Sequence, residues 1–185
     1  DNSEDMLEIA MEKRIESGHD ILYLLQNMQE FELYGTVRAI VSVCDCVNYV
    51  TEKNELQEVF RLVNNYLDPQ GIFIFNTEYK YREVLGNQVI AEDRDECSFI
   101  WENYYNHTSM INEYELTLFV REDEEASLYR KYQESHFQKA YTLREMRGLL
   151  EKAGLKFVAA YDAYTKKAPM YTSERITVIA REYGK

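Results

Sequence analysis

The chain has 185 residues, of which 45% are hydrophobic and 29% are charged, and it contains only seven glycines and two prolines. This length supports one well-buried domain, and the composition excludes collagen-like, low-complexity and linker-rich proteins. The net charge of −12 repels phosphate backbones and anionic lipids, so we expect neither nucleic acids nor membranes as partners.

The first 76 residues are predicted to alternate helices and strands. Residues 3–17 are expected to form a helix that begins after the N-cap Ser3 and ends at Gly18. A second helix spans about 52–66 and stops at a turn in Leu67–Gly71, which contains proline and glycine. Short apolar runs predict three buried strands, at Ile21–Leu25, Ala39–Val43 and Ile72–Phe75. This order is typical of a doubly wound α/β sheet.

The sequence changes character after Asn76. A short segment at Lys80–Leu85 leads into three alternating or aromatic-rich stretches, which predict antiparallel strands with one wet face. These stretches are Cys97–Tyr105, Ile111–Arg121 and Leu128–Ala140. The acidic run Arg121–Glu125 is expected to be a solvated hairpin turn and not a metal site, because consecutive carboxylates in a turn diverge.

A capped helix and a strand pair follow. Thr142 and Glu145 have the spacing of a capping box, which predicts a helix over Thr142–Ala153 that ends at Gly154. The last two strands are predicted at Lys156–Tyr164 and Arg175–Arg181. We therefore expect one α/β domain with its core in residues 1–76 and 142–185, and an antiparallel insertion in residues 77–141 that forms a lid.

Polar side chains follow the predicted core strands, at the sheet edge where open α/β proteins bind ligands. Asn27 and Met28 follow the first strand and could present an amide and an apolar surface to an adenine ring. Asp45, Asn48 and Tyr49 follow the second strand. Each residue alone is also explained as a turn former or a cap, but together they align along one rim.

The cysteines and glycines exclude other chemistry. Cys44, Cys46 and Cys97 are expected to be free thiols, which fits a reducing cytoplasm. Their C-x-C pair has no second pair or neighbouring histidine, so we expect no metal site. No two glycines stand close enough to form G-x-G, so these residues contain no glycine-rich nucleotide loop.

Several motifs, in this order and spacing, resemble the class I S-adenosylmethionine-dependent methyltransferases, and the likeness covers essentially the whole chain. It is greatest for small bacterial stand-alone enzymes with an antiparallel insertion, a layout shared by sugar-amine N-methyltransferases. The motifs are D-x-S-x-x-M-L at Asp1–Leu7, Q-N-M at Gln26–Met28, S-x-C-D-x-x-N-Y at Ser42–Tyr49, L-x-P-x-G at Leu67–Gly71, I-W-E-N at Ile100–Asn103, Y-T-L-R-E-M at Tyr141–Met146, G-L-K-F at Gly154–Phe157 and S-E-R-I at Ser173–Ile176.

The resemblance implies S-adenosylmethionine as the cofactor and assigns it five binding residues. Asp1 matches the acidic residue that binds the ribose hydroxyls, and Met6 matches a residue that lines the adenine pocket. Asn27 and Met28 match the pair beside the adenine, although the family more often has aspartate at the first of these positions. Cys44 belongs to the segment under the methionine moiety and the methyl group.

The resemblance also implies that the family's first strand, glycine-rich loop, first helix and most of its second strand precede Asp1. In the family, two strands separate the Ile21–Leu25 strand from the Ala39–Val43 strand. We therefore expect this chain alone to have a gap in its sheet. Such a gap would leave backbone hydrogen bonds of the central strands unmade. Either the natural protein is longer, or a homodimer or a swapped segment fills the gap.

Methyl transfer depends on a dry pocket, a held nucleophile and sometimes a base. His136 and Asp45 are the candidate catalytic residues, with His136 on the last strand of the insertion. Trp101 could form a substrate wall, since aromatic faces favour cations, although its ring could equally pack against the sheet. The candidate substrate-binding residues are Asn48, Tyr49, Trp101 and Tyr141.

The sequence thus predicts the C-terminal portion of a cytoplasmic S-adenosylmethionine-dependent methyltransferase that acts on a small-molecule substrate. One alternative is a non-catalytic module in which the methyltransferase fold serves interaction or dimerisation. Another is a different Rossmann-type enzyme, such as a dehydrogenase, which would need a G-x-G-x-x-G motif upstream of these residues.

Overall fold

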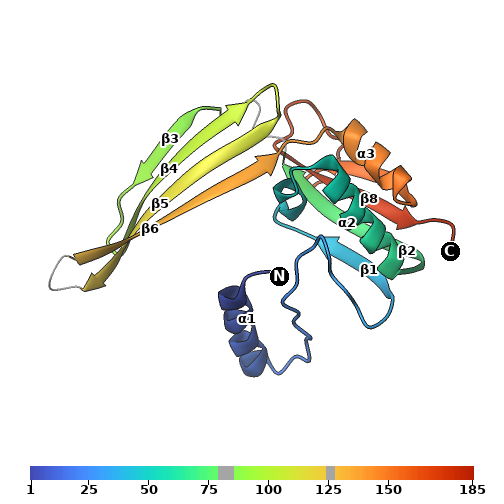
Figure 1. Cartoon of the computed structure of the whole chain (residues 1–185), viewed down its shortest axis with the longest axis horizontal. Helices are drawn as coiled ribbons and strands as arrows, with labels where there is room; N and C mark the ends of the chain where they lie inside the picture. Colours follow the sequence, from blue (N-terminus) through green and yellow to red (C-terminus); the bar gives the residue numbers. More distant parts are fainter. Residues whose placement is uncertain (79–85, 124–127) are drawn as a thin grey trace.

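The computed structural model of this chain describes residues 1–78, 86–123 and 128–185. They form two four-stranded sheets, one with the strand order β1-β2-β8-β7 and the other with the order β3-β4-β5-β6. Figure 1 shows the second sheet extending away from the first as a long arm. We call the sheet β3–β6 the arm and the sheet β1-β2-β8-β7 the core sheet.

The core sheet is mixed. Strand β1 (Val37–Ser42) pairs in parallel with β2 (Leu67–Glu78), β2 pairs antiparallel with β8 (Arg175–Glu182), and β8 pairs antiparallel with β7 (Leu155–Asp162). Within the described residues β1 has no partner along its second edge. The strands predicted at Ala39–Val43 and Ile72–Phe75 and the final strand pair are therefore confirmed.

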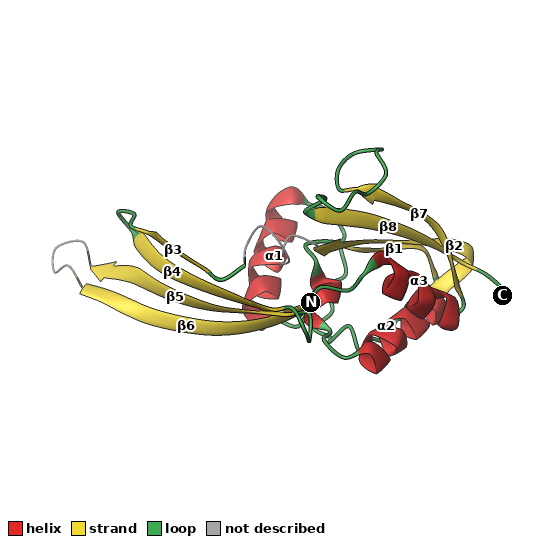
Figure 2. Ribbon diagram, turned by 90° about the horizontal axis from the view of Figure 1, so that it is seen from above, coloured by secondary structure: helices red, strands yellow, loops and turns green. Residues whose placement is uncertain are grey.

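Two amphipathic helices cover one face of the core sheet (Figure 2): α2 (Lys53–Tyr66) and α3 (Leu143–Lys152). The Phe60 ring of α2 lies 5.5 Å from Phe75 and 5.9 Å from Phe73 on β2, centroid to centroid. Burying an aromatic or aliphatic side chain of this kind contributes roughly 1.5–3 kcal/mol. The buried residues of the two helices are Leu56, Val59, Phe60, Val63, Met146, Leu149 and Leu150.

The first helix, α1 (Glu4–Ser17), has the predicted caps but little packing. Ser3 Oγ accepts a hydrogen bond from the Met6 backbone N–H, and Gly18 ends the helix with a φ of 68°. No residue of α1 is buried, and Ile15 is 80% exposed. The caps therefore fix where this helix begins and ends, while its apolar side chains lie on the surface.

The arm consists of antiparallel strands β3 (Gln88–Glu92), β4 (Cys97–Asn106), β5 (Ile111–Asp123) and β6 (Leu128–Lys139). The last three were predicted from alternation in the sequence and are confirmed. The sequence analysis missed β3, whose five residues are too few to show a clear period. The predicted segment Lys80–Leu85 and most of the predicted acidic turn Arg121–Glu125 lie outside the described residues.

Two local predictions differ from the structure. Ile21–Leu25 is not a strand in the structure. Among the described residues, the backbone around it bonds only to Asp1: the amino terminus of Asp1 donates to Leu24 O, and the carbonyl of Asp1 accepts from Gln26 N. A strand needs a neighbouring strand to satisfy its backbone groups. Residues 68–71 form an excursion inside β2 and not a separate turn before it, with Gln70 at a φ of 64°.

In the described part of the chain, the helices are too short or too polar to cross a membrane. The three cysteines are free, as predicted, and no group of three or more metal-binding side chains occurs among the described residues.

The capping box of α3 generates a stability prediction. Burial alone raises the pKa of Glu145, but hydrogen bonds from Lys53 and Thr142 outweigh it and hold this pKa below its usual value. The carboxylate therefore adds stability above the pKa of unfolded glutamate and loses it as the pH falls through the lower folded-state pKa. Glu145→Gln should lower the free energy of unfolding by about 1 kcal/mol at pH 7.

Urea denaturation at pH 7 and again at acidic pH checks this, because the difference between wild type and variant should shrink as the carboxylate is protonated. Glu151→Gln, which removes an exposed carboxylate from the same helix, is the matched control. A Glu145→Gln deficit that stays constant down to pH 2.5, roughly two units below the ordinary glutamate pKa, contradicts the assignment.

Candidate functional site

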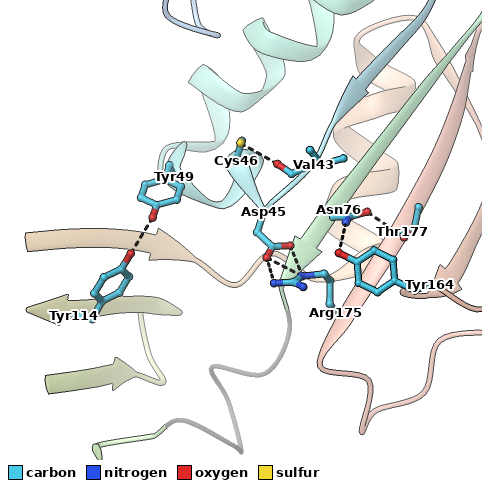
Figure 3. A network of polar contacts seen from close by, with 9 residues as sticks. All are labelled: Val43, Asp45, Cys46, Tyr49, Asn76, Tyr114, Tyr164, Arg175 and Thr177. Carbon is cyan, nitrogen blue, oxygen red and sulfur yellow. Dashed lines mark hydrogen bonds and ion pairs between the residues drawn. The ribbon is translucent and has the colours of Figure 1, made fainter. Parts of the chain in front are cut away.

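The candidate site lies at the carboxyl ends of the parallel strands β1 and β2, the edge where open α/β sheets bind ligands. β1 ends at Ser42, and the chain then makes a tight turn into the short 3-10 helix η1 (Cys46–Tyr49). Figure 3 shows this turn between the core sheet and the base of the arm. The turn therefore stands where the two sheets meet.

The turn is strained. Cys44 and Asp45 both have a φ of 58°, in the left-handed region that residues with a side chain rarely occupy. Such backbone costs of the order of 1–3 kcal/mol per residue and persists only where the surroundings enforce it. Two such residues in succession indicate that neighbouring contacts hold this turn in place.

An ion pair provides the main contact. Arg175, at the start of β8, donates from Nε to both carboxylate oxygens of Asp45 at 2.9 and 2.7 Å, and its Nη2 lies 2.5 Å from Oδ2. Asp45 is only 3% exposed. Planar pairing of this kind fixes both position and orientation. The backbone of Arg175 is itself anchored, because its carbonyl accepts from Ala163 N at 2.9 Å.

A second polar network closes the carboxyl end of β2 (Figure 3). Thr177 Oγ1 donates to Asn76 Oδ1 at 3.0 Å, and Asn76 Nδ2 donates to the Tyr164 hydroxyl at 3.4 Å. Asn76 is buried, whereas Tyr164, in the loop between β7 and β8, is largely exposed. This network ties that loop to the site through a tyrosine that the sequence analysis did not identify.

Helix η1 links the turn to the arm. The fully buried Asn48 donates from Nδ2 to the Lys139 carbonyl of β6 at 2.8 Å, and the Tyr49 hydroxyl lies 3.0 Å from the Tyr114 hydroxyl of β5. Two successive residues of η1 thus contact two neighbouring strands of the arm. The position of the arm base relative to the core sheet therefore depends on η1.

Four aromatic side chains gather at this contact, and we call Tyr49, Trp101, Tyr114 and His136 the junction cluster. The Tyr114 ring stacks on His136 with centroids 4.5 Å apart and an interplanar angle of 16°. Trp101 meets the Tyr114 ring edge-on at 5.8 Å, and Tyr49 meets His136 edge-on at 5.9 Å. His136 Nε2 lies 3.1 Å from a carboxylate oxygen of Glu134.

Three members of this cluster, Tyr49, Trp101 and His136, were predicted from the sequence, and the structure brings them together. Tyr114 was missed. It pairs directly with His136 in the register of β5 and β6, and pairs with Asn103 across β4. Register between strands is the signal that could have found Tyr114, but a single sequence does not provide it.

The predicted cofactor residues form a second group, around the beginning of α1. The hydrogen bond from Gln26 N to Asp1 O, 2.8 Å long, places Asp1 beside the segment that contains Asn27. Met6, in the first turns of α1, is 58% exposed, and Met28 packs against the main core. Asp1 accepts from Ser3 N, so its carboxylate faces the N-terminus of the helix.

The remaining candidates differ in environment. Tyr141 is fully buried and its hydroxyl donates to Val50 O at 2.7 Å, so its side chain forms part of the core. Cys44 is exposed. Burial, followed by the neighbouring Cys44, raises the pKa of the Cys46 thiol, which donates to Val43 O at 3.0 Å. A raised pKa disfavours the thiolate, so Cys46 is poorly suited to be a nucleophile.

No family model matches the sequence. Two curated proteins that are named as inferred methyltransferases are similar to it in sequence. One, from Geobacillus sp. (strain WCH70), is 30% identical over 184 residues, which cover 98% of this chain and 74% of that protein. The other, YqeM of Bacillus subtilis (strain 168), is 30% identical over 179 residues, which cover 95% of this chain and 71% of that protein.

A solved structure gives the same result. The crystal structure of an S-adenosylmethionine-dependent methyltransferase from Clostridium acetobutylicum ATCC 824 superposes on this chain with a TM-score of 0.90 at 27% identity. The superposition covers 100% of this chain and 74% of that one. The similarity therefore includes both the core sheet and the arm.

The junction cluster generates a second prediction. Tyr49→Phe and Tyr114→Phe should each lower the free energy of unfolding, and the double variant should lose less than the sum of the two. The coupling should be about 0.5–1.5 kcal/mol, because either single variant already breaks the bond between the two hydroxyls. Urea denaturation of the four proteins measures it. Tyr34→Phe, at a 96% exposed position, is the control; strictly additive losses would show that the hydroxyls do not interact.

Proposed function

Because this chain belongs to the class I S-adenosylmethionine-dependent methyltransferases, we propose that it transfers the methyl group to a small-molecule acceptor held at the junction cluster. The observation that carries this proposal is the position of the cluster. It adjoins η1, directly after the turn at the carboxyl end of β1, on the side where the arm meets the core sheet. The acceptor site and the strand-end site are therefore neighbours.

The residues around α1 suit the cofactor chemically. Asp1 offers a carboxylate for ribose hydroxyls at the N-terminus of a helix, and Asn27 offers an amide nearby. Met6 and Met28 add apolar surface for an aromatic base. Cys44, exposed on the turn after β1, would lie toward the reactive end of the cofactor. When bound, S-adenosylmethionine supplies an electrophilic methyl group on a sulfonium.

The chain's own residues would then position the acceptor and take up its proton. The rings of Tyr49, Tyr114 and Trp101 present faces that favour cationic groups. His136 stands against these rings and would accept the proton that the acceptor loses as its lone pair attacks. Glu134, whose carboxylate oxygen lies 3.1 Å from Nε2 of His136, would orient the imidazole.

We propose further that this chain acts as the C-terminal portion of the enzyme, completed along β1 by a strand-helix-strand unit. β1 is unpaired along one edge in the described residues, and Val41 on it is 59% exposed. The exposed apolar side chains of α1 also need a neighbour. The matched relatives extend beyond the region they share with this chain. A second copy or a swapped segment would occupy the same edge.

Calorimetry with S-adenosylhomocysteine tests this proposal. Two proteins are compared: the 185-residue chain, and a chimera in which the part of YqeM that this chain lacks is joined ahead of Asp1. The chimera should bind at least tenfold more tightly, because the added unit completes the walls of the cofactor site. Equal affinity of the chain and the chimera, or tight binding only by a dimer of the 185-residue chain, argues against the added unit. Binding by neither protein favours a non-catalytic module.

The role of His136 gives a separate prediction. The binding form is incubated with S-adenosylmethionine tritiated in its methyl group and a deproteinised, low-mass cell extract, and tritium in small molecules is measured. His136→Gln should reduce the transfer rate about 10²- to 10⁴-fold, the usual contribution of a positioned base, without weakening S-adenosylhomocysteine. His107→Gln, an exposed histidine elsewhere on the arm, should retain the wild-type rate. Full activity of His136→Gln contradicts the assignment.

A further inference from the structure

The residue that pairs with the strained turn comes from β8, which β2 separates from β1 in the core sheet. Arg175 lies 130 positions after Asp45 in the sequence, at the start of β8. Three of its nitrogen–oxygen contacts with the Asp45 carboxylate fall between 2.5 and 2.9 Å. In the sequence Arg175 belongs to the S-E-R-I motif at Ser173–Ile176, but that motif does not indicate a contact with Asp45.

The Asp45 carboxylate is engaged by this pairing. Its side chain is 4% exposed, and both of its oxygens accept from the guanidinium. A carboxylate already turned to an arginine is a weak base, because the arginine stabilises its charged form. The side chain of Asp45 is therefore better suited to hold the backbone than to take a proton from substrate.

The backbone that it holds continues into the acceptor site. Asp45 O accepts from Asn48 N at 2.9 Å, which begins η1. Asn48 and Tyr49 then contact β6 and β5 of the arm. A continuous line of contacts thus runs from Arg175 through Asp45 and η1 to the junction cluster.

We infer that Arg175 is a positioning residue for methyl transfer: through its pairing with Asp45 it holds the left-handed Cys44–Asp45 turn, and thereby sets η1 against the junction cluster. This inference rests on the proposed function, because it takes the turn and the cluster as the two sides of the transfer site. Arg175 touches neither the acceptor nor the cofactor in this assignment. Asp45, proposed from the sequence as catalytic, becomes part of the same positioning device.

The inference makes Asp45 and Arg175 one unit, and a double-mutant cycle tests that. In the form of the protein that binds S-adenosylhomocysteine, Arg175→Met and Asp45→Asn should each lower kcat/KM in the tritium assay about 10- to 100-fold, as expected when reacting groups are misplaced. The double variant should be no worse than the poorer single variant. Arg181→Met, which removes an exposed arginine from the same strand, is the matched control and should keep wild-type kinetics.

A rescue variant separates positioning from general loss of stability. Glycine adopts a positive φ without strain, so Cys44→Gly in the Arg175→Met background should recover part of the lost kcat/KM. Cys44→Gly in the wild-type background is the control, because a general gain in stability would act equally in both backgrounds. Circular dichroism checks that each variant folds. If Arg175→Met does not fold, Arg175→Lys replaces it: this variant keeps the charge with fewer contacts, and its kcat/KM should fall below wild type by less than the about 10- to 100-fold expected for Arg175→Met.

Two results would overturn the inference. One is a folded Arg175→Met protein whose kcat/KM and affinity stay within about twofold of wild type. The other is loss of kcat in Asp45→Asn with little change in Arg175→Met, because the carboxylate would then act on the substrate directly. A wild-type protein that neither binds S-adenosylhomocysteine nor methylates small molecules would instead contradict the proposed function.

Discussion

A part-buried carboxylate–guanidinium pair, the buried Asp45 with the partly exposed Arg175, is the constraint on which the site depends. Removing one partner of such a pair leaves an uncompensated charge in the interior, which is far more costly than the pair is stabilising. Here the pair lies at two consecutive residues of positive φ, and it offsets their strain. The start of η1, and through it the contact between the core sheet and the arm, follows from this one geometry.

The architecture divides the work between the two sheets. The core sheet, covered on one face by α2 and α3 (Figure 2), provides the strand ends. The arm contributes the aromatic side chains of Trp101, Tyr114 and His136. Contacts between the sheets converge on η1. Further structure would pack on the free edge of β1 and on the exposed face of α1. The edge of β1 leaves backbone groups, and α1 leaves apolar side chains, without a neighbour among the described residues.

Local signals predicted most of this fold. Within the described residues, periodicity and caps located the three α-helices and seven of the eight strands, as Thr142 and Glu145 illustrate. The strand predicted at Ile21–Leu25 was wrong, because apolar residues indicate that a segment could be buried as a strand but not that a partner strand is present. In the site, Tyr49 was proposed from a motif and His136 from its place on the last strand of the insertion. The roles of Arg175 and Tyr114 were not foreseen, since an ion pair across 130 positions and a strand register are tertiary properties.

The central claim is that the methyl group is transferred between the Cys44–Asp45 turn and the junction cluster. A crystal structure of the S-adenosylhomocysteine complex measures this directly, through the position of the ligand sulfur. The account predicts that the sulfur lies against the turn and faces His136, with the ribose hydroxyls on Asp1. A sulfur atom on the opposite side of the core sheet from η1, or a ribose bound away from Asp1, would contradict it.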